Sequence, residues 1–207
     1  MDTPDKASRE FSRQDLVGTL ESFRWKGSHL PMSDLDTSVL MSRAEQWLLH
    51  DPDADYRERI KDWLARKDHE ALARSFSSRL DFGTAGIRGE LGAGPGFMNR
   101  ALIRMVSAGL ADYLLEKVPD AAKRGIVIGH DARRGSADFT ADACSVFTAK
   151  GIRVHVMQPL VPTPLVAFAT LRLNAACGVV VTASHNPPAY NGYKVYWENG
   201  AQIVPPH

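Results

Sequence analysis

A serine, a histidine and a lysine lie close together near the C-terminal end of the sequence. Ser184 and His185 directly follow the run 177–182, whose β-branched residues predict a buried strand that ends at the serine. Lys194 follows after a loop that prolines at 187–188 stiffen. In open α/β sheets, ligands bind beyond the carboxyl ends of the strands. A hydroxyl placed there can carry a phosphoryl group while cations neutralise its charge. A lone Ser–His pair, however, more often belongs to a polar loop in which the serine caps a helix.

The elements that must position these residues alternate in type along the second half of the chain. Hydrophobic spacing predicts helices over 99–118, 136–150 and 163–171, and strands over 125–128, 152–157 and 177–182. Thr163 and Pro164 suggest a cap and a first-turn proline for the third helix, and Asn199-Gly200 favours a closing hairpin between 193–197 and 201–204. This alternation predicts a three-layer α/β/α domain with a mixed, largely parallel sheet.

A short helical arm is predicted before this domain. Apolar residues recur at helical spacing over 35–50, 56–64 and 69–76, and Asp34 or Asp36 is a candidate cap for the first helix. The chain is therefore expected to divide into a poorly ordered extension (1–32), a helical arm (33–78) and the α/β domain (79–207). The change in composition at Met32 makes that residue a candidate start codon.

Composition excludes several classes of function. The 207 residues are 44% hydrophobic and 24% charged, which suits a sizeable core. A formal net charge of +1 without a basic block argues against nucleic acid, and the sequence has neither a membrane span of about 20 apolar residues nor the apolar core of a secretory signal. Cys144 and Cys177 lie far apart without a CxxC pattern, which predicts reduced thiols and a cytoplasmic location.

The glycine-rich stretch 83–96 follows a short predicted strand at 79–82 and is expected to be a loop that turns tightly or approaches a ligand. It is not a P-loop, because no GKS or GKT follows, nor a G-x-G-x-x-G dinucleotide turn. Ser184 does not lie in a G-x-S-x-G elbow, so a hydrolase is unsupported.

Four sequence blocks occur together in one order: FGTAGIRG (82–89), GHDAR (129–133), VPTPL (161–165) and TASHNPPAYNGYKVYWENGAQI (182–203). In these blocks the chain resembles the phosphoglucomutase/phosphomannomutase (α-D-phosphohexomutase) superfamily over roughly residues 79–207. The first and last blocks most resemble the phosphoglucomutase-2/phosphopentomutase branch, and 33–78 resembles the arm that often precedes it.

The resemblance implies an intramolecular phosphotransferase that interconverts sugar 1-phosphates and 6- or 5-phosphates in carbohydrate metabolism. Ser184 matches the phosphoserine, which gives its phosphoryl group to a sugar monophosphate and recovers one from the resulting bisphosphate. Lys194 and Arg88 match residues that transfer a proton or stabilise charge, and His185 matches a residue flanking the phosphoserine. The expected substrate-binding or supporting residues are Thr84, Asn186, Asp131 and Arg133.

The resemblance also implies Mg²⁺, bound to Ser184 through its phosphate, and a sugar bisphosphate activator. The segment DPDADYR (51–57) resembles the family's DGDADR metal loop, but Pro52 replaces a glycine and the segment precedes the serine block, so a turn between helices with a capping aspartate explains it better. The carboxylate ligands are thus not expected within this sequence. The alternative is a non-catalytic fragment or interaction module, and the choice among phosphosugars stays open.

Overall fold

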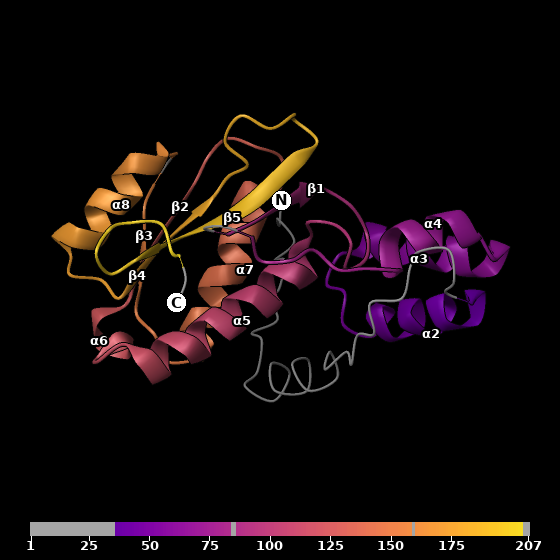
Figure 1. Cartoon of the computed structure of the whole chain (residues 1–207), viewed down its shortest axis with the longest axis horizontal. Coiled ribbons are helices and arrows are strands. Elements are labelled where there is room, and N and C mark those ends of the chain that lie inside the picture. The colour runs from indigo at the N-terminus through magenta and orange to yellow at the C-terminus, as the bar shows by residue number, and fades with distance from the viewer. Residues whose placement is uncertain (1–35, 84–85, 159, 205–207) are drawn as a thin grey trace, which may run out of the picture.

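One mixed sheet forms the centre of the molecule. In the computed structural model, which describes residues 36–83, 86–158 and 160–204, five strands lie in the order β1-β5-β4-β2-β3 (Figure 1). They are β1 (Gly86–Glu90), β2 (Ile126–His130), β3 (Val154–Val156), β4 (Cys177–Val181) and β5 (Tyr190–Trp197). β4, β2 and β3 pair in parallel, whereas β5 is antiparallel to both of its neighbours. Every strand except β5 therefore runs in one direction, as the sequence predicted.

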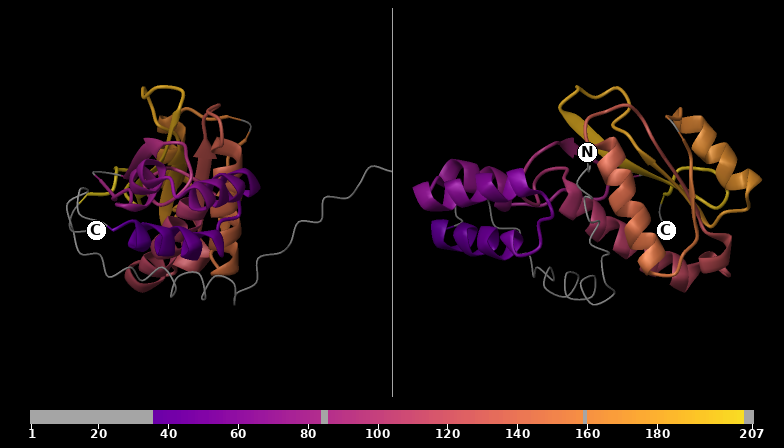
Figure 2. Two further views of the ribbon diagram at one scale, coloured as in Figure 1. Left: turned by 90° about the vertical axis from the view of Figure 1, so that its right-hand side faces the viewer. Right: turned by 180° about the vertical axis from the view of Figure 1, so that it is seen from behind.

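Helices cover both faces of this sheet, which confirms the three-layer prediction. α5 (Arg100–Lys117) and α7 (Ser136–Ala149) pack against one face, and α8 (Thr163–Arg172) packs against the other (Figure 2). A short helix that the sequence did not predict, α6 (Ala121–Arg124), lies between α5 and β2. None of the helices within the described ranges is long and apolar enough to cross a membrane.

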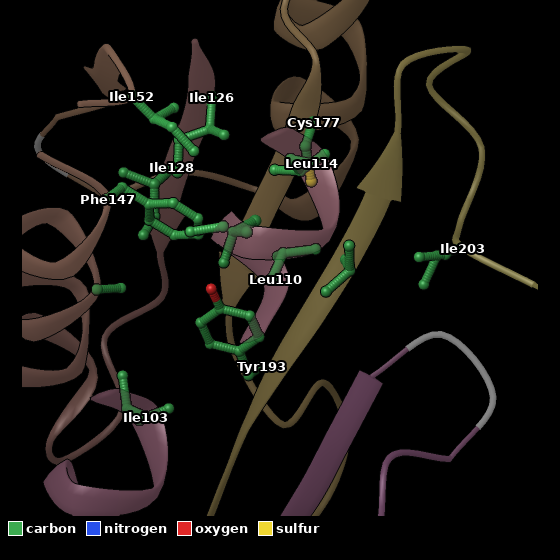
Figure 3. Packing of buried hydrophobic residues seen from close by; sticks show 14 of the residues in the cluster. Ile103, Leu110, Leu114, Ile126, Ile128, Phe147, Ile152, Cys177, Tyr193 and Ile203 are labelled. Atoms are coloured by element: carbon green, nitrogen blue, oxygen red, sulfur yellow. The ribbon is translucent and has the colours of Figure 1, made fainter. Parts of the chain in front are cut away.

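The core divides according to which way strand side chains point. Ile126 and Ile128 of β2 face α5 and α7, whereas Val127 between them faces α8, because successive strand residues point to opposite faces. Tyr193 of β5 is fully buried on the α5 side (Figure 3), and its hydroxyl forms a 3.0 Å hydrogen bond with Ser107 Oγ. This bond satisfies the phenol and fixes the middle of β5.

The arm consists of α2 (Thr37–Leu48), α3 (Ala54–Arg66) and α4 (His69–Phe76). Its apolar side chains form a separate cluster in which Trp47 and Phe76 meet edge to face, with ring centroids 6.5 Å apart. Ala93 and Ala101 of the α/β part belong to the same cluster, so the arm is packed onto the rest of the molecule. The division into arm and domain stays a prediction, and the predicted extension 1–32 lies outside the described residues.

Local capping chemistry explains where the predicted helices begin. Asp36 accepts a hydrogen bond from Ser38 N at the start of α2, and Asp53 accepts from Asp55 N and Tyr56 N at the start of α3. Each carboxylate thereby satisfies helix N–H groups that have no partner within the helix. The interpretation of 51–57 as a turn with a capping aspartate is confirmed.

The glycine-rich segment was partly mispredicted. No strand forms at 79–82, and the stretch expected to be a loop supplies β1. Gly86 has φ +146°, and a Cβ atom there would overlap the carbonyl oxygen of Tyr193. Glycine is needed because β1 approaches β5 too closely for a side chain, so here it marks a strand contact.

Three other expectations need smaller corrections. β3 is shorter than the predicted 152–157. Pro162, not Thr163, is the cap residue of α8, because Thr163 already has helical geometry. In the predicted hairpin, β5 begins at Tyr190, and the return segment forms only a bridge, between Tyr196 and Gln202.

Candidate functional site

Ser184 lies in an exposed loop immediately beyond the carboxyl end of β4, where the sequence placed it. Its backbone is left-handed, with φ 58°. Residues other than glycine adopt this conformation rarely, at a cost of roughly 1–2 kcal/mol, so neighbouring groups must hold it. Such local strain is typical of functional sites.

Asp131, which follows β2, supports this loop from the adjacent strand. Its Oδ2 accepts a 2.6 Å hydrogen bond from Thr182 Oγ1, and its Oδ1 accepts bonds from Ser136 Oγ and Arg133 N, both at 3.0 Å. Thr182 Oγ1 in turn accepts a 2.9 Å bond from Ser184 N. β2 and β4 are parallel neighbours, so their carboxyl ends lie together and these contacts form.

Arg133 binds the backbone of the serine loop. Its Nη2 donates to the carbonyl oxygens of Ser184 (2.7 Å) and Asn186 (2.8 Å), and its Nη1 donates to those of Pro187 (2.9 Å) and Tyr190 (3.1 Å). Nε lies 3.2 Å from Asp131 Oδ2. Both Nη atoms of the guanidinium thus donate to backbone carbonyl oxygens, two each. Arg133 is therefore a clamp on the loop.

Arg88 and Lys194 come together on the opposite side of β5 from Tyr193. Arg88 pairs with Gly192 and Lys194 pairs with Gly86 in the β1–β5 register, which places both cations on one face of the sheet. Burial, and next the nearby Arg88 charge, lower the pKa of Lys194. Within the described ranges no carboxylate forms an ion pair with Lys194. The pair is a concentration of positive charge suited to an anion.

An open cleft of about 680 Å³ lies in front of the serine. It is lined by Asp131, Ala132, Arg133, Arg134, Ser184, Asn186, Pro188 and Ala189. The structure therefore brings four predicted site residues to one cleft. His185 is exposed and does not line it. Arg88 of β1 and Lys194 of β5 do not line it either, and Thr84 falls outside the described residues.

The family model for phosphoglucomutase/phosphomannomutase, alpha/beta/alpha domain I, matches residues 79–207. The chain belongs to the phosphoglucomutase/phosphomannomutase family. Residues 79–207, which contain the sheet and the serine loop, correspond to domain I of this family.

Individual relatives agree with this assignment. The chain is 45% identical over 169 residues to a probable phosphoribomutase of Schizosaccharomyces pombe. The aligned region covers 82% of this chain and 29% of that protein. The chain is 40% identical over 168 residues to human phosphopentomutase (78% and 28%) and 36% identical over 185 residues to human glucose 1,6-bisphosphate synthase (86% and 29%). The chain therefore spans less than a third of the length of these curated relatives.

Solved structures show the same fold. The crystal structure of a Thermus thermophilus protein assigned as a phosphomannomutase aligns with a TM-score of 0.55 at 32% identity, over 62% of this chain and 28% of that one. A phosphoglucomutase/phosphomannomutase family protein from Burkholderia thailandensis aligns with a TM-score of 0.50 at 27% identity (59% and 27%).

The Mg²⁺ that mutase chemistry implies has no complete set of protein ligands in the part of the chain that the structure describes. No group of three or more metal-ligating side chains occurs among those residues. Asp131 is the acidic residue of the cleft, and both of its oxygens already accept hydrogen bonds. These residues alone do not fit a magnesium centre.

Sequence reasoning missed Thr182 and Arg134. Thr182 is 3% exposed and holds the serine amide, whereas Arg134 is exposed at the rim of the cleft. A signal for Thr182 was present, because threonine two residues before a residue in a turn commonly accepts its backbone N–H. Arg134 follows the GHDAR block directly, but its type alone does not separate a cleft residue from a surface cation.

Proposed function

We propose that this chain is the phosphoserine-bearing domain of a phosphosugar mutase. The observation that supports this most directly is Ser184 itself, exposed at a cleft in a left-handed conformation, with its carbonyl oxygen bound by Arg133 and its amide bound by Thr182. Ser184 would carry the phosphoryl group on Oγ and transfer it to a hydroxyl of a sugar monophosphate, which forms a bisphosphate. In this step the sugar hydroxyl gives up its proton and Ser184 Oγ gains one. The other phosphoryl group of the bisphosphate then returns to Oγ with the reverse proton movement, so the serine is phosphorylated again at the end of the cycle.

The surrounding cations suit this transfer. A phosphoserine carries about −1.5 to −2 charges near neutral pH, and phosphoryl transfer relies on alignment and charge stabilisation. Arg88 would contact phosphate oxygens in bidentate fashion, and Lys194 would act as a point charge or proton carrier. His185 would contact the phosphate or the sugar, as would Thr84 and Asn186.

Pentose and hexose phosphates are the proposed substrates. Relatives named phosphoribomutase and phosphopentomutase favour a pentose phosphate, and the relative named glucose 1,6-bisphosphate synthase favours a sugar bisphosphate as activator. The Mg²⁺ that the family resemblance implies would need carboxylate ligands in addition to the residues that the structure describes. A cytoplasmic location, without a nucleic-acid or membrane partner, remains part of the prediction.

Phosphoryl uptake by Ser184 tests the proposal. We expect the chain, incubated with glucose 1,6-bisphosphate, to gain one phosphoryl group at Ser184, measured by intact-mass and peptide mass spectrometry. Ser184→Ala removes the acceptor oxygen and abolishes the gain. Ser145→Ala, an exposed serine on α7, is the matched control and leaves it unchanged. Labelling that persists in Ser184→Ala would show that another residue is the acceptor.

The second candidate, a non-catalytic fragment or interaction module, is favoured by the chain's coverage of less than a third of its relatives. It predicts no labelling of Ser184 and no turnover of glucose, mannose, ribose or deoxyribose monophosphates. Measurable turnover of any of these sugars by the 207-residue chain would exclude it.

A further inference from the structure

The left-handed turn at Ser184 depends on a side chain that does not reach the cleft. Thr182 is 3% exposed and lies two residues before the serine. Its Oγ1 is 2.9 Å from Ser184 N and 2.6 Å from Asp131 Oδ2. The hydroxyl therefore joins the backbone of the reactive loop to the end of β2.

The direction of these two hydrogen bonds is fixed by chemistry. A backbone amide only donates, so Thr182 Oγ1 must accept from Ser184 N. An ionised carboxylate only accepts, so the single hydroxyl proton must point to Asp131 Oδ2. The other oxygen of Asp131, Oδ1, accepts from Arg133 N and Ser136 Oγ. Charge-assisted bonds of this kind are short and strong.

Two separate contacts therefore hold the loop. Arg133 binds its carbonyl oxygens, and Thr182 binds the amide of the serine. Removing the threonine hydroxyl leaves the bond from Arg133 to the Ser184 carbonyl oxygen in place but releases the Ser184 amide, so the unfavourable left-handed conformation loses one of its two supports. Thr182 is the contact made at the Ser184 N–H.

We propose that Thr182 is a positioning residue that holds Ser184 in the conformation needed to accept and transfer a phosphoryl group. The role of Thr182 in phosphoryl transfer rests on the proposed mutase function. Its role in holding the turn at Ser184 does not depend on that function. Thr182 acts on the reaction through Ser184 N and Asp131, and its methyl group contributes only packing.

Two substitutions separate the hydroxyl from the methyl group. Thr182→Val keeps the shape and removes the hydroxyl, and Thr182→Ser keeps the hydroxyl and removes the methyl group. If Thr182 were only a packing residue, serine would be the more harmful change. If it positions Ser184, valine is the more harmful change and serine restores function.

The test uses the full 207-residue chain and two readouts. Loss of one hydrogen bond of ordinary strength corresponds to about a tenfold change in an equilibrium or rate. We expect Thr182→Val to speed hydrogen exchange of the Ser184 amide, followed by NMR, and to slow Ser184 phosphorylation by glucose 1,6-bisphosphate, each by about that factor. Thr182→Ser stays close to the parent in both. Thr182→Ala is the second hydroxyl-free variant and repeats the loss if the valine variant does not fold.

The outcomes are distinct. Parent-like exchange and labelling in Thr182→Val, or equal loss in the serine and valine variants, would overturn the positioning role. If the parent chain itself takes up no phosphoryl group, the proposed function fails while amide exchange still decides whether Thr182 holds the turn.

Discussion

At the residue scale, the site combines a fixed serine with a partly buried pair of cations. The exposed Ser184 backbone is held by Arg133 and Thr182, whereas Lys194 is only 7% exposed and shares its face of the sheet with Arg88. Burial and a like charge both oppose protonation of a lysine. A bound anion would oppose both effects through its opposite charge, which favours the protonated lysine.

The titration of Lys194 is the first prediction at this scale. Because its pKa is lowered from the usual 10.5, Lys194 loses its proton at a lower pH than a free lysine. Arg88→Gln removes the like charge, so the pKa of Lys194 rises and its titration moves to higher pH. NMR titration of the Lys194 side chain measures this shift without requiring activity. An unchanged or lower inflection in the variant would show that Arg88 does not act on Lys194.

The sequence predicted the positions of residues that directly follow a recognisable strand or helix. Ser184 was placed correctly because a buried strand followed by a serine predicts a position at the sheet edge. The contacts of Arg133 could not be predicted from the sequence, because its Nη atoms bind carbonyl oxygens that lie some fifty residues away along the chain. Such contacts exist only once β2 and β4 are neighbours.

At the element scale, capping side chains determine where helices begin. Asn99 does more than cap α5. Its Oδ1 accepts from Leu102 N, and its Nδ2 donates to the carbonyl oxygens of Gly92, Gly94 and Phe97. One buried amide therefore both starts the helix and closes the glycine-rich loop that follows β1.

We expect Asn99→Ala to lower the free energy of unfolding by about 2–4 kcal/mol, because it removes a cap together with three hydrogen bonds to backbone carbonyl oxygens of the loop. Asp53→Ala, which removes only the cap of α3, is the control and costs about 1 kcal/mol. Urea denaturation measures both values. Equal losses in the two variants would mean that the amide bonds of Asn99 contribute nothing.

Helices and strands could be predicted where the hydrophobic pattern is local. A strand was missed where its pairing partner is distant in sequence. The predicted helices and the buried strands β2 and β4 follow hydrophobic spacing. β1 was missed because glycines interrupt its sequence, and it is a strand only because β5 pairs with it. The context-dependence of strand formation is a general property of sheets.

At the scale of the whole molecule, the arm and the α/β part share one cluster of buried side chains. Phe76 of α4 is fully buried, and its cluster includes Ala93 and Ala101. The ion pair between Arg74 and Glu90, at 2.8 Å, adds a polar contact between the arm and the end of β1. The arm is therefore expected to unfold together with the sheet.

Phe76→Ala tests this coupling. Truncation of a buried phenylalanine costs about 3–5 kcal/mol, and we expect that loss to appear in one transition seen alike by tryptophan fluorescence and far-ultraviolet circular dichroism. Phe168→Ala, at a side chain 63% exposed on α8, is the matched control and changes stability by less than about 1 kcal/mol. Two separate transitions in the Phe76 variant would show that the arm unfolds independently.

The strand order has a consequence for how the chain is made. Gly86 of β1 pairs with Lys194 of β5, so the first strand along the chain can join the sheet only after the fifth has been made. During synthesis, β2, β3 and α7 emerge and can associate while β1 still has no partner. The two cations of the site meet only when β5 inserts between β1 and β4, since pairing of segments far apart in sequence forms late. The newly made chain therefore acquires its helices before it acquires its charged site.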